Sequence, residues 1–232
     1  MFLLTHVIDG RIAKIYPESK FGSGFFYFIA LFFICGIISD KVINLIKVIA
    51  LDLVGVLVKE NDFVLDKTNE KLERLFGKNR SDFEFSSQAT EIVPSLDINS
   101  LKERCKYICS SIYSLKITLG ELSKFKEQHK DIKLVVATNH ISCVKEFILK
   151  AFGPDLFDEI FISAELNTVK PEAEFYNKML ETLNVKPEEI CFVDDSQENV
   201  VGANNVGIIH TIHTTKTSNT LSLIEAMLSS DT

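Results

Sequence analysis

The sequence lacks several patterns, and each absence excludes a class of protein. Its 232 residues include five cysteines but no C-x-x-C pair, and this odd, scattered set favours reduced, buried thiols over a disulfide framework. Acidic residues outnumber Lys and Arg, giving a net charge of −7, which argues against a nucleic-acid partner because such proteins neutralise phosphates with clustered basic residues. Neither an internal repeat nor a low-complexity linker is found.

Two of the cysteines have a spacing that can signal a metal site. Cys105 and Cys109 are one helical turn apart. We interpret them as small apolar residues on a helix face rather than as metal ligands.

One long hydrophobic run is present near the N-terminus. Residues 25–38 are nearly all apolar, and with the residues around them the run reaches only about the 20 residues that cross a hydrocarbon core. Flanking charges set no orientation, and no cleavage site is clear. Two alternatives stand for residues 1–41: a single-pass anchor through residues 22–39, or an extension without function on a cytoplasmic protein.

Apolar runs that end in polar residues alternate with helical patterns in the rest of the chain. Four runs predict buried strands: residues 47–53, 133–137, 159–163 and 190–193. The helices predicted between and after them span residues 120–130, 142–152, 171–184, 197–206 and 222–228. This alternation predicts an α/β fold with a doubly wound, Rossmann-like parallel sheet, in which ligands bind at the carboxyl ends of the strands.

One polar segment breaks the alternation. Residues 59–119 contain helical patterns at 68–76 and 101–112 and no buried strand. We therefore expect a core of residues 42–58 and 120–232, with residues 59–119 as a helical insertion.

Candidate chemistry follows each predicted strand. The first strand leads into Asp52 and the glycine turn D-L-V-G-V-L, the second into Thr138, Asn139 and His140, and the third toward Lys170. The fourth delivers the motif V-D-D-S-x-x-N-V-x-G-A, with Asp194, Asp195 and Asn199.

These motifs in this order resemble those of the haloacid-dehalogenase-like hydrolases over roughly residues 47–214. The resemblance implies that residues 59–119 are a cap that closes over the substrate. It implies that Asp52 attacks phosphorus and forms an aspartyl-phosphate. Thr138 would bind a phosphoryl oxygen, and Lys170 would stabilise charge between Asp52, Asp194 and the phosphate.

The resemblance also implies a magnesium site. Asp52, Asp194 and Asp195 would hold Mg²⁺ together with the backbone carbonyl of Val54, since hard cations prefer oxygen ligands. We count Asn139 and His140 with the phosphate-binding residues, and we count Gly55 and Asn199 as supporting residues.

Val54 is a departure from the usual pattern of the family. Most phosphatases of the family carry an Asp here that protonates the leaving group, and valine transfers no proton. A subgroup with D-L-G-G-V or D-L-G-N-V first motifs also lacks this Asp and includes sugar-phosphate phosphatases. His140 is a candidate for the missing acid because an imidazole titrates near neutral pH.

The predicted function is therefore Mg²⁺-dependent hydrolysis of a small phosphorylated metabolite such as a sugar phosphate. One alternative is hydrolysis of 2-haloacids, which needs no acid on the leaving halide. Another is a catalytically silent binding module that has lost its acid at Val54. The sequence predicts neither the exact substrate nor the oligomeric state.

Overall fold

The computed structural model describes residues 7–8, 11–12 and 46–230. The chain divides into two compact units, Met1–Ile43 and Asn44–Thr232. In the first unit, β1 (Val7–Ile8) pairs antiparallel with β2 (Arg11–Ile12). The predicted anchor at residues 22–39 lies outside the described residues. Within the described ranges, none of the helices has the length and apolar character needed to cross a membrane.

A five-stranded parallel sheet forms the centre of the second unit. Its strands run in the order β7-β6-β3-β8-β9. They are β3 (Val48–Leu51), β6 (Lys133–Thr138), β7 (Glu159–Ile162), β8 (Ile190–Asp194) and β9 (His210–His213). The four predicted strands are present, and the predicted α/β fold with a parallel sheet is confirmed. Strand β9 was not predicted, because its sequence H-T-I-H contains no apolar run and Ile212 is its only buried residue.

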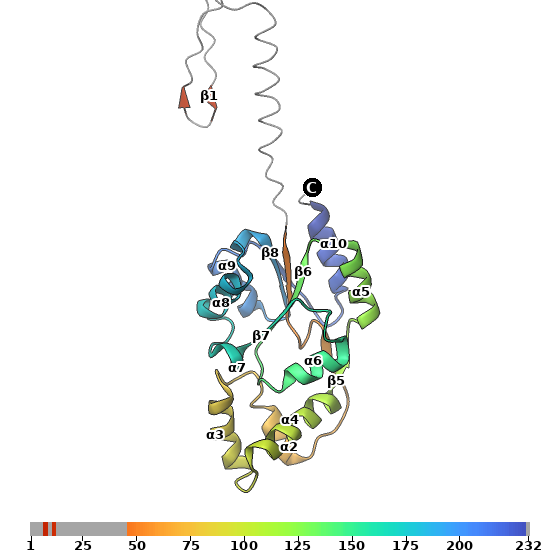
Figure 1. Ribbon diagram of the computed structural model, residues 1–232, viewed down its shortest axis with the longest axis vertical. Coiled ribbons are helices and arrows are strands. Elements are labelled where there is room, and N and C mark those ends of the chain that lie inside the picture. Colours follow the sequence, from red (N-terminus) through yellow and green to blue (C-terminus); the bar gives the residue numbers. More distant parts are fainter. Residues whose placement is uncertain (1–6, 9–10, 13–45, 231–232) are drawn as a thin grey trace, which may run out of the picture. The chain divides into compact units, whose positions relative to one another are not determined.

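The central strand β3 is buried on both faces, and its residues alternate between two hydrophobic layers. Ile49 and Leu51 pack in one cluster with side chains of α5 (Leu119–Gln128), α6 (Val144–Phe152) and α10 (Thr220–Ser230). Val48 and Ala50 pack in the other with side chains of α8 (Ala173–Leu183) and α9 (Gln197–Asn205). Such two-sided burial explains why the strand reads as a continuous aliphatic run rather than as an alternating one. Figure 1 shows the sheet between these two layers of helices.

The core helices begin and end near their predicted positions, except for the four-residue α7, which was not predicted. They are α5 (Leu119–Gln128), α6 (Val144–Phe152), α7 (Ser163–Leu166), α8 (Ala173–Leu183), α9 (Gln197–Asn205) and α10 (Thr220–Ser230), with a 3-10 turn at Pro187–Glu189. Thr118 and Glu121 form a capping box at the start of α5, and Asn184 ends α8 in the left-handed conformation.

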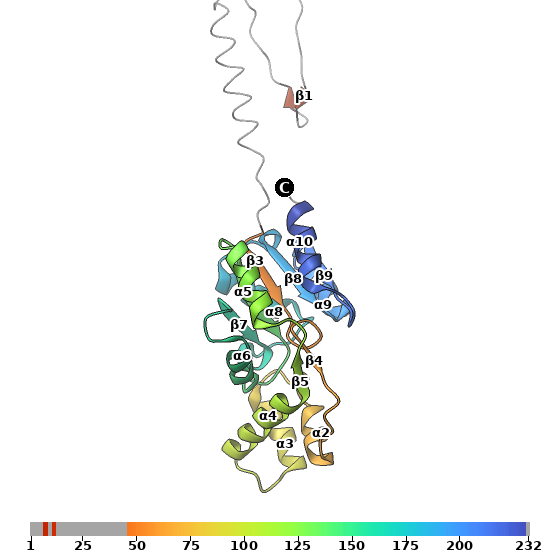
Figure 2. The same ribbon diagram turned by 90° about the vertical axis from the view of Figure 1, so that its right-hand side faces the viewer.

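Residues 58–115 form a helical insertion after β3, and we call this segment the cap. Its stem is an antiparallel pair, β4 (Val58–Glu60) with β5 (Tyr113–Leu115), and between them lie α2 (Lys67–Glu73), α3 (Asp82–Ile92) and α4 (Ile98–Ile112). Helix α3 was not predicted because it buries only Phe85 and Ala89, so its apolar periodicity is weak. The cap lies beyond the carboxyl ends of the core strands (Figures 1 and 2).

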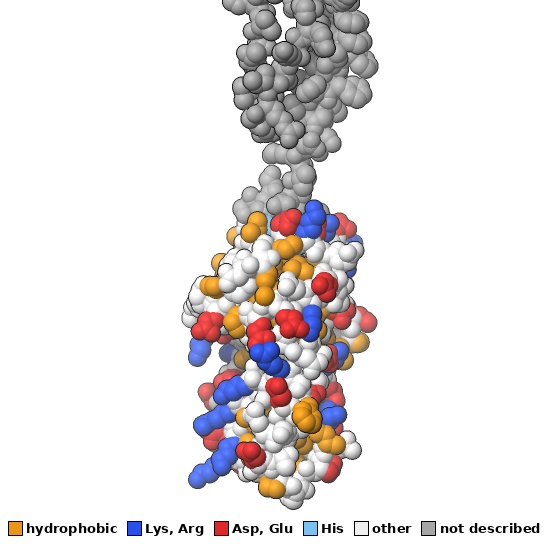
Figure 3. Space-filling view, turned by 90° about the vertical axis from the view of Figure 1, so that its left-hand side faces the viewer, with side chains coloured by type: hydrophobic (Ala, Val, Ile, Leu, Met, Phe, Trp, Pro, Cys, Tyr) orange, Lys and Arg blue, Asp and Glu red, His pale blue; other side chains and the backbone are white. Residues whose placement is uncertain are grey.

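The surface of this unit carries charges of both signs. Figure 3 shows one face, on which Lys and Arg side chains are interspersed with Asp and Glu over cap and core. This mixture is ordinary for a protein surface and gives that face no single-sign field.

Candidate active site

The ends of three neighbouring strands bring the predicted site residues together. Asp52 directly follows β3, Asp194 ends β8 and Thr138 ends β6. The backbone N–H of Asp52 donates to the Val193 carbonyl at 2.9 Å, which continues the pairing of β3 with β8 by one residue. Backbone pairing therefore sets the two carboxylates side by side.

Lys170 lies between these two carboxylates. Its Nζ is 3.0 Å from Asp52 Oδ1 and 2.6 Å from Asp194 Oδ2. It also donates to the Ala137 carbonyl at 2.7 Å. The three donors of the ammonium thus have three acceptors, and this matters because the side chain is buried and an unpaired buried charge is costly.

Asn139 determines where the lysine loop lies. Its Oδ1 accepts from the backbone N–H of Lys170 at 2.8 Å, and its Nδ2 donates to the Lys170 carbonyl at 2.8 Å. The next peptide bond, Lys170-Pro171, is cis. The side-chain amide, which we predicted near the phosphate, is therefore engaged with the Lys170 backbone.

Asn199 and Ser196 hold the Asp194 carboxylate. Asn199 Nδ2 lies 3.1 Å from Asp194 Oδ1 and 3.2 Å from Oδ2, and the Ser196 backbone N–H donates to Oδ1 at 2.9 Å. Hydrogen bonds to both oxygens orient the carboxylate for a ligand or a cation.

Three carboxylates form a cluster that fits a divalent cation. One oxygen each from Asp52, Asp194 and Asp195 lies within 4.8 Å of the others. Three hard anionic oxygens this close together are the donor set that Mg²⁺ prefers. The carbonyl of Val54, the fourth predicted ligand, stays a prediction.

Burial and mutual repulsion shift the pKa values of the acidic groups in this cluster. Burial and the charge of Asp194 raise the pKa of Asp52 to about 7, although Lys170 acts to lower it. Burial and Asp194 also raise the pKa of Asp195. Burial would lower the pKa of Lys170, but the two carboxylates outweigh it and raise that pKa. A bound cation would relieve the repulsion between the carboxylates.

Gly55 allows Asp195 to approach the turn that follows Asp52. Its φ of +91° lies in the region that favours glycine, and a Cβ built at this position would lie 2.2 Å from Asp195 Oδ2. No side chain larger than hydrogen fits there unless the carboxylate moves. The glycine of the D-L-V-G-V-L motif is thus explained by contact with a predicted metal ligand.

Thr138 and His140 have different surroundings from those of the charged cluster. Thr138 is buried at the end of β6. His140 is buried against the cap, with Nε2 3.1 Å from the Tyr113 hydroxyl and Nδ1 accepting from the Ile141 N–H at 3.0 Å. Burial lowers the pKa of His140 to about 4, so the imidazole is neutral at pH 7. This environment disfavours His140 as the replacement acid.

Sequence reasoning missed Lys116, which lies next to the cluster. Its Nζ donates to the carbonyls of Gly55 at 2.7 Å and Thr215 at 2.9 Å. Burial lowers the pKa of this ammonium while Asp195 acts to raise it. The stretch S-L-K-I-T carries no motif, and only the fold returns the stem of the cap to the turn after Asp52.

Polar contacts join the cap to the core around the site. Arg80 pairs with Glu172 at 2.5 Å, and Lys106 pairs with Glu146 at 2.5 Å. The Ser142 N–H donates to Asp82 at 3.0 Å.

The fold is a parallel sheet, and its carboxyl edge carries a candidate carboxylate nucleophile, a buried lysine and an acidic pair. This combination is typical of one class of hydrolases. Residues 49–212 match the family model described as haloacid dehalogenase-like hydrolase. The chain belongs to this family and is a hydrolase, as predicted.

Named relatives include phosphatases. A Clostridium perfringens protein, provisionally named pyrophosphatase PpaX, is 27% identical over 176 residues, which are 70% of this chain and 81% of that protein. The sesquiterpene phosphatase astK of Aspergillus oryzae is 46% identical over 55 residues, 24% of this chain and 28% of astK.

The fold also matches solved structures. A haloacid-dehalogenase-family enzyme of Bacteroides thetaiotaomicron, solved in complex with magnesium and inorganic phosphate, superposes with a TM-score of 0.61. It is 20% identical, and the match covers 77% of this chain and 98% of that one.

Proposed function

We propose that this hydrolase is a Mg²⁺-dependent phosphatase that acts on small phosphorylated metabolites, such as sugar phosphates, through an aspartyl-phosphate at Asp52. The observation that carries the proposal is the Lys170 ammonium, held 3.0 Å from Asp52 and 2.6 Å from Asp194 beside Asp195. A divalent cation held by the three carboxylates would, together with Lys170, give the site the fixed positive partners that charge developing on a phosphoryl group needs.

Each residue has a defined task in the proposed reaction. A carboxylate oxygen of Asp52 attacks phosphorus, an O–P bond forms, and the bond from phosphorus to the leaving oxygen breaks. Lys170 acts to lower the pKa of Asp52 and offsets the charge that accumulates on the phosphoryl oxygens, and Thr138 donates a hydrogen bond to one of them. Water then attacks the phosphoryl group, which releases phosphate and regenerates the Asp52 carboxylate.

Asp194, Asp195 and Asp52 would hold Mg²⁺, together with the Val54 carbonyl. The ion supplies electrostatic stabilisation of the transferring phosphoryl group. Asn199 orients Asp194, and Gly55 gives Asp195 the space to approach.

Val54 restricts which leaving groups this site handles well. An alkoxide leaves slowly without a proton donor, and neither Val54 nor the neutral, buried His140 suits that task. Phosphate and aryl oxide are weaker bases and need no proton to leave. We therefore include pyrophosphate among the candidate substrates, in keeping with the name of the PpaX relative.

The test is hydrolysis by the purified full-length protein with and without Mg²⁺. The substrates are p-nitrophenyl phosphate, pyrophosphate, a panel of sugar phosphates and a 2-haloacid. We expect Mg²⁺-dependent phosphate release that Asp52→Asn lowers by about 10³-fold or more. Turnover of the haloacid without Mg²⁺ would make the protein a dehalogenase. No turnover of even the aryl phosphate would make it a binding module.

Val54→Asp tests the missing acid directly. Restoring a carboxyl group should speed hydrolysis of sugar phosphates by about 10²-fold while changing aryl phosphate hydrolysis little. Equal acceleration of both would show that the leaving-group proton does not limit the reaction.

A further inference from the structure

Three cysteines converge where the cap meets the core, away from the charged cluster. Cys105 and Cys109 lie one turn apart on cap helix α4 and are buried. Cys143 is the N-cap residue of core helix α6, which packs against α4. Cys105 of the cap and Cys143 of the core line the same cavity, so the two thiols face each other's elements across the boundary between cap and core.

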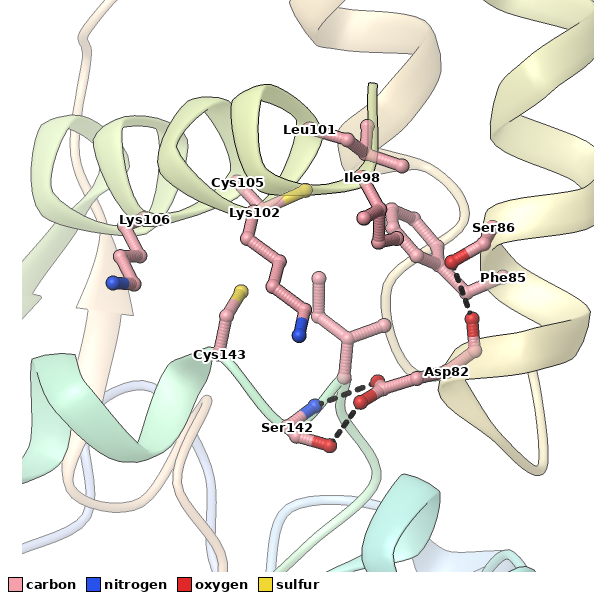
Figure 4. A pocket seen from close by; sticks show the side chains of 11 residues that line it. Asp82, Phe85, Ser86, Ile98, Leu101, Lys102, Cys105, Lys106, Ser142 and Cys143 are labelled. Carbon is pink, nitrogen blue, oxygen red and sulfur yellow. Dashed lines mark hydrogen bonds between the residues drawn. The ribbon is translucent and has the colours of Figure 1, made fainter. Parts of the chain in front are cut away.

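A cavity of about 170 Å³ gives access to this cluster. Cys105 and Cys143 both line it, as do Lys102, Lys106 and Asp82. Figure 4 shows the Cys143 sulfur directed toward α4 and the Lys102 ammonium reaching into the space beside it. Within the described chain, the lining excludes Asp52, Lys170, Asp194 and Asp195, so the cavity is separate from the candidate active site.

The surroundings make Cys143 the reactive thiol of the three. Hydrogen bonds from Cys105 and Cys109 lower the pKa of Cys143, with a smaller contribution from His140, while burial and Asp82 act to raise it. The pKa values of Cys105 and Cys109 are raised, chiefly by the same hydrogen bonds and by burial. The N-terminus of α6 also favours a thiolate, because the helix dipole places partial positive charge there.

We propose that Cys143 and Cys105 form a reversible, peroxide-driven disulfide that links the cap to the core. The Cys143 thiolate attacks one oxygen of hydrogen peroxide, which gives a sulfenic acid and hydroxide. The Cys105 thiol then attacks the sulfenic sulfur, the S–S bond forms, and water leaves. The two thiols lose two electrons and the peroxide gains them, and a dithiol reductant reverses the change.

The consequence for activity rests on the function proposed above. The disulfide adds a covalent bond beside two existing contacts between cap and core, Lys106 with Glu146 and Asp82 with Ser142. All three links join the cap to the core, so the cap of the oxidised protein stays against the core. Substrate entry and product release need the cap to open, and the oxidised enzyme turns over slowly.

The primary experiment needs no substrate. The full-length protein is treated with hydrogen peroxide, remaining thiols are blocked, and linked peptides are identified by mass spectrometry before and after dithiothreitol. We expect a Cys143–Cys105 cross-link that dithiothreitol removes. A cross-link of Cys143 to another cysteine, irreversible oxidation of Cys143 alone, or no modification would each overturn the proposal.

Two variants on one helix provide matched controls. Cys105→Ala should abolish the cross-link to Cys143, whereas Cys109→Ala, one turn away, should retain it. Thermal unfolding of each reduced variant verifies that it is folded. An unchanged cross-linking yield at Cys143 in Cys105→Ala would contradict the assignment.

The secondary readout is phosphatase activity. Peroxide should lower turnover by about tenfold, with recovery in dithiothreitol and no loss in Cys105→Ala. If the reduced protein hydrolyses nothing, the proposed function fails while the peptide map still tests the disulfide. If the reduced enzyme is active and no cross-link forms, only the disulfide proposal fails.

Discussion

Ion pairs occur both in the interior of the core and between the cap and the core, but the first are buried and the second are exposed to water. Lys170 and Asp194 in the core are almost completely buried. In the pair that joins the cap to the core, the side chains of Arg80 and Glu172 are 53% and 30% exposed. Water screens the exposed pair and not the buried one, so removing one buried partner leaves a charge that nothing compensates. The core therefore holds a pre-formed charged site, whereas the ion pair between Arg80 and Glu172 exchanges readily with water.

The sharpest test of this contrast removes the shared cation of the core. Lys170→Met leaves Asp52 and Asp194 facing each other in a buried site, and we expect a loss of about 3–5 kcal/mol in the free energy of unfolding. Urea unfolding without Mg²⁺ measures it.

A surface control and a double variant test whether the loss comes from the buried charge. Lys145→Met removes a cation paired with Glu165 at 3.2 Å on the surface, and it should change stability by less than about 1 kcal/mol. Asp52→Asn combined with Lys170→Met should recover part of the loss, because one of the two repelling carboxylates is gone. Equal effects of Lys170→Met and Lys145→Met would remove the distinction between core and surface pairs.

His140 tests whether the boundary between cap and core excludes water. Its pKa falls from 6.5 to about 4 on folding, so its contribution to stability is fully present above pH 6.5 and is lost as the pH falls toward 4. From pH 7 to pH 5 this group alone should cost about 2 kcal/mol of unfolding free energy. His140→Gln should show a correspondingly smaller loss over that range. Parallel pH profiles for both proteins would mean that His140 is hydrated.

Gly55 tests how closely the turn must fit Asp195. Gly55→Ala introduces a Cβ into the space of the Asp195 carboxylate at a φ of +91°, and we expect about 1–2 kcal/mol of destabilisation. Calorimetric titration should also show Mg²⁺ binding weakened by about tenfold or more. Gly120→Ala is the matched control, because nothing lies within 4 Å of its Cβ and helix α5 gains a better helix former. A normal Mg²⁺ affinity in Gly55→Ala would contradict the role of Asp195 in binding.

The smallest effect is expected at the exposed contact between cap and core. Arg80→Ala should lower the unfolding free energy by less than about 1 kcal/mol, because its pair with Glu172 is solvated. Arg74→Ala removes a pair with Glu70 inside the cap and is the control for losing an exposed arginine. A loss at Arg80 as large as that at Lys170 would show that the cap is fixed as rigidly as the core.

Several features of the fold could be predicted because they depend on local patterns. Strands such as Val48–Leu51 are continuous aliphatic runs, and the residues of the family motifs follow directly after them. The features that were missed have weak local signals. Helix α3 buries little apolar surface, and strand β9 lies at an edge of the sheet with two histidines among its four residues.

The amino-acid sequence by itself determined where the candidate catalytic and metal-binding residues lie. A residue that follows a buried parallel strand must lie at the carboxyl edge of the sheet. Asp52, Thr138 and Asp194 follow that rule. The roles of Asn139, His140, Lys116 and Cys143 depend on contacts between segments far apart in the chain. Such contacts are set by packing of the whole core and cap, and packing decides which polar groups lose water and which partner replaces it.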